Sequence, residues 1–125
     1  MKAKLTIQGR LPGLNEYIAA ERSNRHAAAQ MKREAQQGVE WAVRAQLRGV
    51  HFTRPVQMHY RWFEPDRRRD KDNVSAFGRK VIQDALVSAK VLKNDNWACI
   101  DGFSDEFCVD KKRPRIEVEI DDDEI

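Results

Sequence analysis

The chain has 125 residues, with 23 Lys and Arg against 20 Asp and Glu, a formal net charge of +3 and a pI of about 9.0. This length fits one domain. A hydrophobic fraction of 41% suffices for a core, whereas a mean hydropathy of -0.75 and the lack of any long apolar run exclude a membrane-spanning protein. Because the N-terminal residues alternate instead of forming an apolar signal core, we expect a cytoplasmic protein.

The charge is distributed unevenly along the chain. Residues 116–125 carry six of the 20 acidic residues and no basic one, which leaves residues 1–115 with 23 basic against 14 acidic residues and a charge of +9. A basic body favours a polyanionic partner because neutralised phosphates release counterions. The same composition also suits a solvated basic surface. We expect one domain over residues 1–120, followed by a solvated acidic tail over residues 121–125.

The first half of the chain shows both strand and helix patterns. Alternating apolar residues predict a short strand over residues 3–7, which a segment rich in Gly and Pro ends. Residues 14–23 are expected to be irregular or a single turn. Apolar residues at helical spacing predict a helix over residues 24–47, and strict alternation predicts a second strand over residues 56–63.

The second half of the chain begins with the clearest helical pattern, over residues 74–89. Residues 97–103 favour a short extended piece, and residues 106–111 and 115–120 favour two final strands. The predicted order is β-α-β-α-β-β, a single mixed α+β domain of the α/β class in which a small mixed sheet packs against two main helices.

Two cysteines, Cys99 and Cys108, are too few for a disulfide framework and lack the close spacing of a redox pair or a zinc site. We expect both to be reduced, buried thiols.

The densest chemistry lies in the loop that precedes the clearest helix. If residues 66–72 are extended, Asp70 and Asp72 project to the same side. Paired carboxylates with a third acid suit Mg²⁺ or Mn²⁺, which prefer oxygen ligands and keep waters that a phosphate can displace. The alternative is structural: Asp72 or Asn73 caps the helix while Asp70 pairs with a neighbouring arginine. The residues alone leave both interpretations open.

Basic residues and a further acid extend this cluster. Arg67, Arg68 and Arg69 can grip phosphates, although an arginine run also suits a solvated loop. Lys80 shares a helix face with Asn73 and Asp84, so it either reaches the phosphate or forms an i, i+4 ion pair with Asp84. Asp95 is the candidate third acid, in a turn whose Asn and Asp content also needs no function.

Taken in order, these motifs resemble the RusA family of Holliday junction resolvases, in its phage-encoded branch. The resemblance runs from Arg67 to Ile120, with a looser match to an N-terminal signature at residues 11–17 that lacks the usual Pro-Pro. The motifs that carry it are Arg68-Arg69-Asp70-Lys71-Asp72-Asn73, Lys80-Val81-Ile82-Gln83-Asp84-Ala85-Leu86, Val91-Leu92-Lys93-Asn94-Asp95-Asn96-Trp97 and Val109-Asp110-Lys111-Lys112-Arg113-Pro114-Arg115-Ile116.

The resemblance implies a Mg²⁺-dependent endodeoxyribonuclease, with Mn²⁺ as a possible substitute, that acts as a homodimer on four-way DNA junctions in recombination and repair. Its metal-binding aspartates correspond to Asp70, Asp72 and Asp95. Its catalytic lysine corresponds to Lys80, but other members hold that lysine one helical turn nearer the paired aspartates, where this chain has Ala76. The residues that we expect to contact DNA are Arg67, Arg68, Arg69, Lys71 and Asn73.

Two other functions stay open: a nuclease for forks, flaps or other branched DNA, and a non-catalytic DNA-binding module. Trp41, Trp62 and Trp97 suit either a core or stacking on unpaired bases, and Trp97 is the strongest stacking candidate because it follows Asp95 closely.

Overall fold

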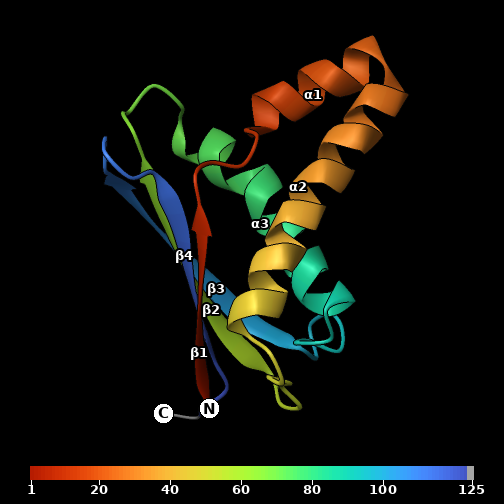
Figure 1. Ribbon diagram of the computed structural model, residues 1–125, viewed down its shortest axis with the longest axis vertical. Coiled ribbons are helices and arrows are strands. Elements are labelled where there is room, and N and C mark those ends of the chain that lie inside the picture. Colours follow the sequence, from red (N-terminus) through yellow and green to blue (C-terminus); the bar gives the residue numbers. More distant parts are fainter. Residues whose placement is uncertain (124–125) are drawn as a thin grey trace.

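Three helices cover one face of a four-stranded sheet in the computed structural model, which describes residues 1–123 (Figure 1). The strands are β1 (Lys2–Gln8), β2 (Val56–Glu64), β3 (Ile100–Val109) and β4 (Arg115–Asp121). The helices are α1 (Leu14–Ser23), α2 (Arg25–Gln46) and α3 (Lys71–Ser88). None of the helices in residues 1–123 is both long enough and apolar enough to span a bilayer.

The sheet has the strand order β1-β4-β2-β3. β4 is antiparallel to both of its neighbours, whereas β2 and β3 run parallel. Because parallel strands cannot be joined by a tight turn, the chain crosses over between them, and α3 forms that crossover. This connection places the N-terminus of α3 beside the end of β2, where the candidate site lies.

The core lies between the sheet and the two longer helices. Alternate residues of β1, β2 and β4 point toward the helices and are buried, while the intervening residues are polar except for Phe63. Burial of these apolar side chains is the main stabilising contribution to the fold. The fully buried residues of the core include Leu5, Met58, Tyr60, Val118 and Ile120 of the sheet and Val39, Val43, Val81 and Ile82 of the helices.

The predicted fold class is confirmed: the chain is a mixed α+β domain, and the two main helices and the strands at both ends match the periodicity of the sequence. The prediction for residues 14–23 was wrong, because this segment is the ten-residue helix α1. Its stability comes from tertiary contacts, among them Tyr17 against Phe77 at 4.7 Å between ring centres. The weak local pattern did not indicate them.

The two extended pieces predicted after α3 are one continuous strand. β3 runs from Ile100 to Val109 and pairs with β2 over the full length of β2. The two predicted pieces were separated at the polar residues Ser104 and Asp105, but main-chain pairing with β2 continues through both residues. Residues 110 and 111, which the sequence pattern included in the predicted strand over residues 106–111, belong to the turn that follows β3.

Two smaller expectations also change. Cys99 and Cys108 are free thiols, as predicted, but they are half-buried rather than buried. The acidic tail is not wholly solvated: Asp122 and Asp123 each accept a hydrogen bond of 2.7 Å from the ammonium group of Met1, and the Asp122 side chain is only 9% exposed. The rest of the predicted tail, residues 124–125, lies outside the described residues.

Candidate active site

The two central acids lie where the chain enters α3. Asp70 is the N-cap residue and Asp72 lies in the first helical turn. The condition of an extended segment through Asp72 is not met, because the backbone turns into the helix directly after Asp70. Both residues nevertheless stay at the same end of α3.

The side chains of Asp70 and Asp72 are both exposed. The Asp70 side chain makes no capping hydrogen bond. Within residues 1–123, neither Asp70 nor Asp72 forms a side-chain hydrogen bond or an ion pair, although three arginines precede them. The structural alternative, in which Asp72 or Asn73 caps α3 while Asp70 pairs with an arginine, is therefore not what the structure shows: Asp70 holds the N-cap position, and the Asn73 side chain binds α1. The carboxylate oxygens are available to a cation.

An open groove of about 960 Å³ lies beside these acids, between the start of α3 and the end of β3. Arg67 and Lys71 contribute basic side chains to it, and Phe107 and Val109 form part of its apolar wall. A groove with acids that can hold a cation and bases that can hold an anion is suited to a phosphodiester.

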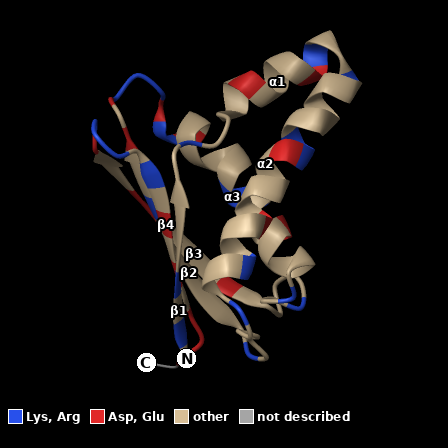
Figure 2. Cartoon of the chain, viewed as in Figure 1, with Lys and Arg blue, Asp and Glu red and all other residues tan. Residues whose placement is uncertain are grey.

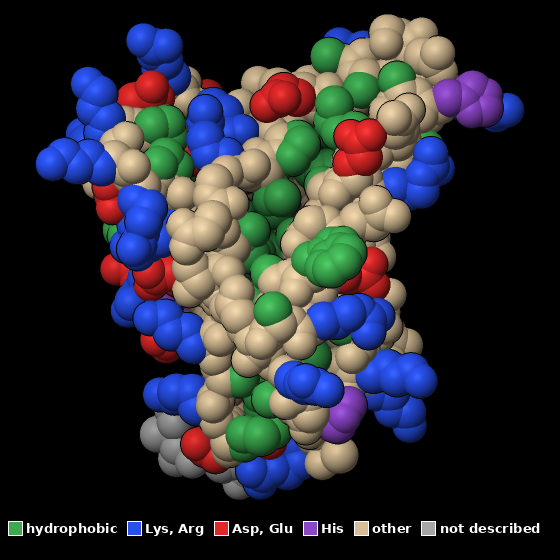
Figure 3. All heavy atoms as spheres, in the orientation of Figure 1, with side chains coloured by type: hydrophobic (Ala, Val, Ile, Leu, Met, Phe, Trp, Pro, Cys, Tyr) green, Lys and Arg blue, Asp and Glu red, His purple; other side chains and the backbone are tan. Residues whose placement is uncertain are grey.

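Basic residues gather around the groove from two segments. Lys and Arg occupy the loop from β2 to α3 and the turn from β3 to β4 (Figures 2 and 3). A hydrogen bond of 2.8 Å from the Asp110 amide to the Glu64 carbonyl holds these two segments together. The turn adds three exposed bases that were not predicted as site residues, although their consecutive run was a signal: Lys111, Lys112 and Arg113.

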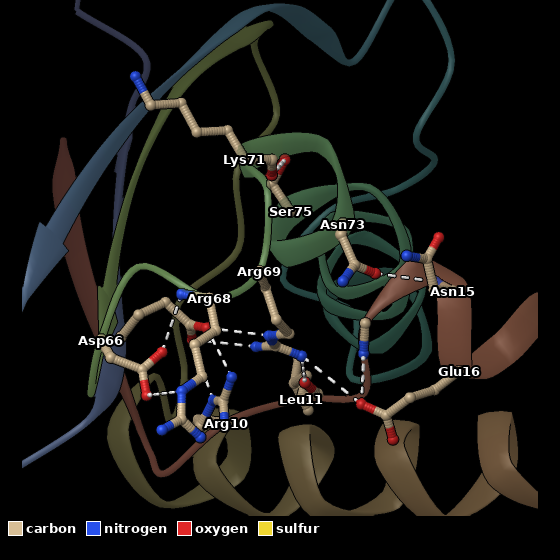
Figure 4. Close-up of polar contacts among 12 residues, drawn as sticks. Arg10, Leu11, Asn15, Glu16, Asp66, Arg68, Arg69, Lys71, Asn73 and Ser75 are labelled. Carbon is tan, nitrogen blue, oxygen red and sulfur yellow. Dashed lines mark hydrogen bonds and ion pairs between the residues drawn. The ribbon is translucent and has the colours of Figure 1, made fainter.

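The three consecutive arginines have different roles. Arg67 and Arg68 are exposed, and Arg68 lies 3.6 Å from the Asp66 carboxylate. Arg69 points inward and is 15% exposed; its Nε and one terminal nitrogen donate to Glu64 at 2.9 and 3.0 Å (Figure 4). Its other terminal nitrogen donates to the Leu11 carbonyl at 3.2 Å. Arg69 thus holds the loop that presents Asp70.

Glu64 is the centre of this buried contact. It lies at the inward-facing end of β2, is 8% exposed, and also accepts hydrogen bonds from Arg10 at 2.8 and 3.2 Å. Desolvation raises the pKa of this carboxyl, but the hydrogen bonds from Arg69 and Arg10 outweigh it and leave the pKa below its usual value. Glu64 therefore stays ionised between two guanidinium groups.

Asn73, expected to contact DNA, has an internal partner. Its side-chain oxygen accepts a hydrogen bond of 2.8 Å from the amide of Asn15, in the first turn of α1 (Figure 4). Glu16 accepts a further bond from the amide of Gly13 at 3.2 Å. These contacts satisfy amides that a helix N-terminus leaves unpaired, so α3 supplies part of the cap of α1.

The contact between the start of α1 and the start of α3, the α1–α3 joint, leaves no room for a side chain at Gly13. A Cβ atom there would lie 2.6 Å from the Asn73 side-chain oxygen and 3.0 Å from an Arg69 nitrogen. We expect Gly13→Ala to lower the free energy of unfolding by about 1–3 kcal/mol, because the clash forces the joint apart. Chemical denaturation measures the loss. Gly38→Ala, in open space on α2, is the matched control and is expected to stabilise by up to about 1 kcal/mol. Equal stability of both variants would contradict a tight joint.

Lys80 and Asp95 form a second cluster. The Lys80 ammonium lies 2.6 Å from the Asp95 carboxylate and 3.0 Å from Asp84, so the predicted i, i+4 pair is present. Hydrogen bonds to Asp95 and then Asp84 raise the pKa of Lys80, and the bond from Lys80 lowers the pKa of Asp95. Both groups are therefore charged at neutral pH.

The structure does not bring all three candidate aspartates together in one chain. Asp72 and Lys80 are eight residues apart on α3, which corresponds to about 12 Å along the helix. Within residues 1–123, the one group of three acidic, His or Cys side chains with ligand atoms inside 4.8 Å is Asp121, Asp122 and Asp123. Asp95 therefore lies with Lys80, apart from Asp70 and Asp72.

The fold thus presents exposed acidic and basic side chains at one groove, a combination that can bind a phosphodiester. Comparison with known families then gives the identity: the model of the endodeoxyribonuclease RusA family matches residues 12–121. The chain therefore belongs to the RusA family of endodeoxyribonucleases, as the motifs suggested. A search of curated proteins finds no match.

Proposed function

We propose that this chain is a Mg²⁺-dependent, structure-selective endonuclease that resolves four-way DNA junctions as a homodimer. The observation that carries the proposal is the pair of exposed carboxylates, Asp70 and Asp72, which have no partner among residues 1–123 and lie beside a basic loop in a chain of this family. Two ionised carboxylates at a surface that binds a polyanion repel its phosphates unless a bound cation neutralises them.

The donor set fits a hard divalent cation. Asp70 and Asp72 offer only carboxylate oxygens, which suit Mg²⁺ and also Mn²⁺, and the open groove leaves space for waters and a phosphate. When bound, such an ion orients an attacking water and stabilises the departing 3′ oxygen. Asp95 is the proposed third ligand.

The separation of Asp95 from the other two acids bears on the assembly. A homodimer accommodates it, because a two-fold axis allows Asp95 of one subunit to approach Asp70 and Asp72 of the other. The same symmetry suits a junction, in which two strands of like polarity are cut. Lys80, whose pKa is raised, would then carry its positive charge to the phosphate together with Asp95.

The basic residues divide into two groups in this proposal. Arg67, Arg68 and Lys71 are exposed and are assigned to DNA phosphates. Arg69 and Asn73 are assigned a positioning role, since their polar groups already hold Glu64, Leu11 and α1.

Titration of Mg²⁺ with a synthetic four-way junction, a replication fork and a linear duplex tests the proposal. Paired, symmetric, Mg²⁺-dependent nicks in the junction are the expected result. Preferential cleavage of the fork would instead support a nuclease for other branched DNA. Binding without cleavage at any Mg²⁺ or Mn²⁺ concentration would support a non-catalytic module and overturn the proposal.

A further inference from the structure

Two large aromatic side chains are exposed in residues 97–103, the segment that follows Asp95. Trp97 is 98% exposed and Phe103 is 51% exposed. Burial of an aromatic side chain is strongly favourable, so the exposed Trp97 side chain contributes little burial free energy to the fold of the isolated chain. Trp62, by comparison, is 2% exposed in the core.

The turn that carries Trp97 is braced without it. The side-chain oxygen of Asn94 accepts a hydrogen bond from the Asp95 amide at 2.7 Å, and that of Asn96 accepts one from Ala98 at 3.2 Å. The Asn96 carbonyl also accepts bonds from the amides of Cys99 and Ile100. The turn therefore keeps its shape by its own polar contacts and holds the indole outward.

Phe103 is fixed beside the same part of α3. The guanidinium of Arg79 lies 4.6 Å from the centre of the Phe103 ring and is itself held by Asp105 and Ser75. Lys80, the next residue of α3, binds Asp95. Phe103 and the turn of Trp97 thus flank a single turn of α3.

Two basic residues lie in the segment between α3 and Trp97, and the Asp101 carboxylate that follows Trp97 accepts a hydrogen bond from Gln57 at 2.9 Å. Lys90 and Lys93 are exposed and form no ion pair within residues 1–123. Aromatic faces together with free cations are the combination that binds unpaired nucleotides, since the rings stack on bases and the cations bind phosphates. A partner with both a flat π-face and negative charge fits this surface.

We propose that Trp97 stacks on an unpaired base at the branch point of DNA, with Phe103 as a second aromatic surface. This inference rests on the proposed function and deepens it, because it gives the site a means to recognise branched over linear DNA. Base pairs in a linear duplex are stacked on one another and offer no free face. The interaction places an opened base beside Asp95 and Lys80.

The test uses full-length Trp97→Ala with metal omitted, so that binding is measured without cleavage. We expect about a tenfold loss of affinity for a four-way junction, equivalent to about 1.4 kcal/mol, and unchanged affinity for linear duplex. In wild-type protein, 2-aminopurine at the branch point should lose fluorescence on binding, whereas in Trp97→Ala it should not. Trp97→Phe is expected to restore most of the affinity.

Trp41→Ala is the matched control, because Trp41 is 78% exposed but lies on α2. It should bind the junction as wild type does. Wild-type affinity and wild-type 2-aminopurine quenching in Trp97→Ala would overturn the inference. Loss of self-association in Trp97→Ala, measured by sedimentation, would also overturn it and assign the surface to a second copy of the chain. Failure of the wild-type protein to cut branched DNA would instead refute the proposed function.

Discussion

Asp70→Asn is expected to reduce Mg²⁺-dependent cleavage of a four-way junction on the order of 10³-fold, because loss of the proposed metal ligand would remove about 4 kcal/mol of charge stabilisation. Junction binding should be retained or tightened. The Asp70 carboxylate is exposed and makes no hydrogen bond with the described part of the chain, residues 1–123, so its neutralisation breaks no contact there. It also removes a negative charge that faces phosphates. Single-turnover cleavage and metal-free binding assays measure the two effects separately.

Asp66→Asn provides the matched control in the same loop. Asp66 accepts a hydrogen bond from the Arg68 amide at 2.9 Å and is not assigned to the metal. An asparagine oxygen can still accept that bond, so cleavage should change by only a few-fold. Full activity of Asp70→Asn, or equal losses in both variants, would rule out Asp70 as a metal ligand.

The elements that could be predicted from the sequence are those whose pattern is local. α3 shows apolar spacing from Val74 onward, and the inward residues of β2 alternate strictly. α1 could not be predicted, because Tyr17 packs on Phe77 and the amide of Asn15 binds Asn73, two residues that lie far along the chain. Local propensity carries no information about such partners.

The same difference between local patterns and distant partners decides which site residues could be predicted. Asp70 and Asp72 could be found because acids and bases are adjacent in the sequence. The inward role of Arg69 depends on Glu64, whose one sequence signal is an acid at a position where the alternation of β2 calls for a buried residue. The distance between Asp95 and the paired acids depends on the path of the chain after α3, which no local pattern fixes.

Glu64→Ala is expected to lower the free energy of unfolding by about 2–4 kcal/mol. The Arg69 side chain, which is 15% exposed, would lose the two bonds to Glu64 and keep a longer contact of 3.7 Å with the exposed Glu16 carboxylate. Breaking a buried ion pair from one side is strongly destabilising. Arg10 is 38% exposed and loses less, since solvent replaces part of the interaction. Chemical denaturation measures the change.

Glu106→Ala is the matched control for solvent exposure. Glu106 also accepts hydrogen bonds from two basic side chains, Arg61 and His59, but is 52% exposed on the open face of the sheet. Its removal is expected to cost much less stability than the removal of Glu64, because solvent screens an exposed ion pair. Similar losses in Glu64→Ala and Glu106→Ala would show that burial of Glu64 contributes nothing to its effect.

The pH dependence of Glu64→Gln separates the charge of Glu64 from its shape. The pKa of Glu64 is lowered in the folded state, so its ionised form stabilises the fold above the ordinary value of 4.5. That contribution is lost as the pH falls through the lowered folded-state pKa. The stability difference between wild type and Glu64→Gln should therefore be full at pH 7 and shrink in acid. Because Arg69 links Glu64 to the loop of Asp70, cleavage by Glu64→Gln at pH 7 should fall even at temperatures where the variant remains folded, whereas Glu106→Ala should cleave normally.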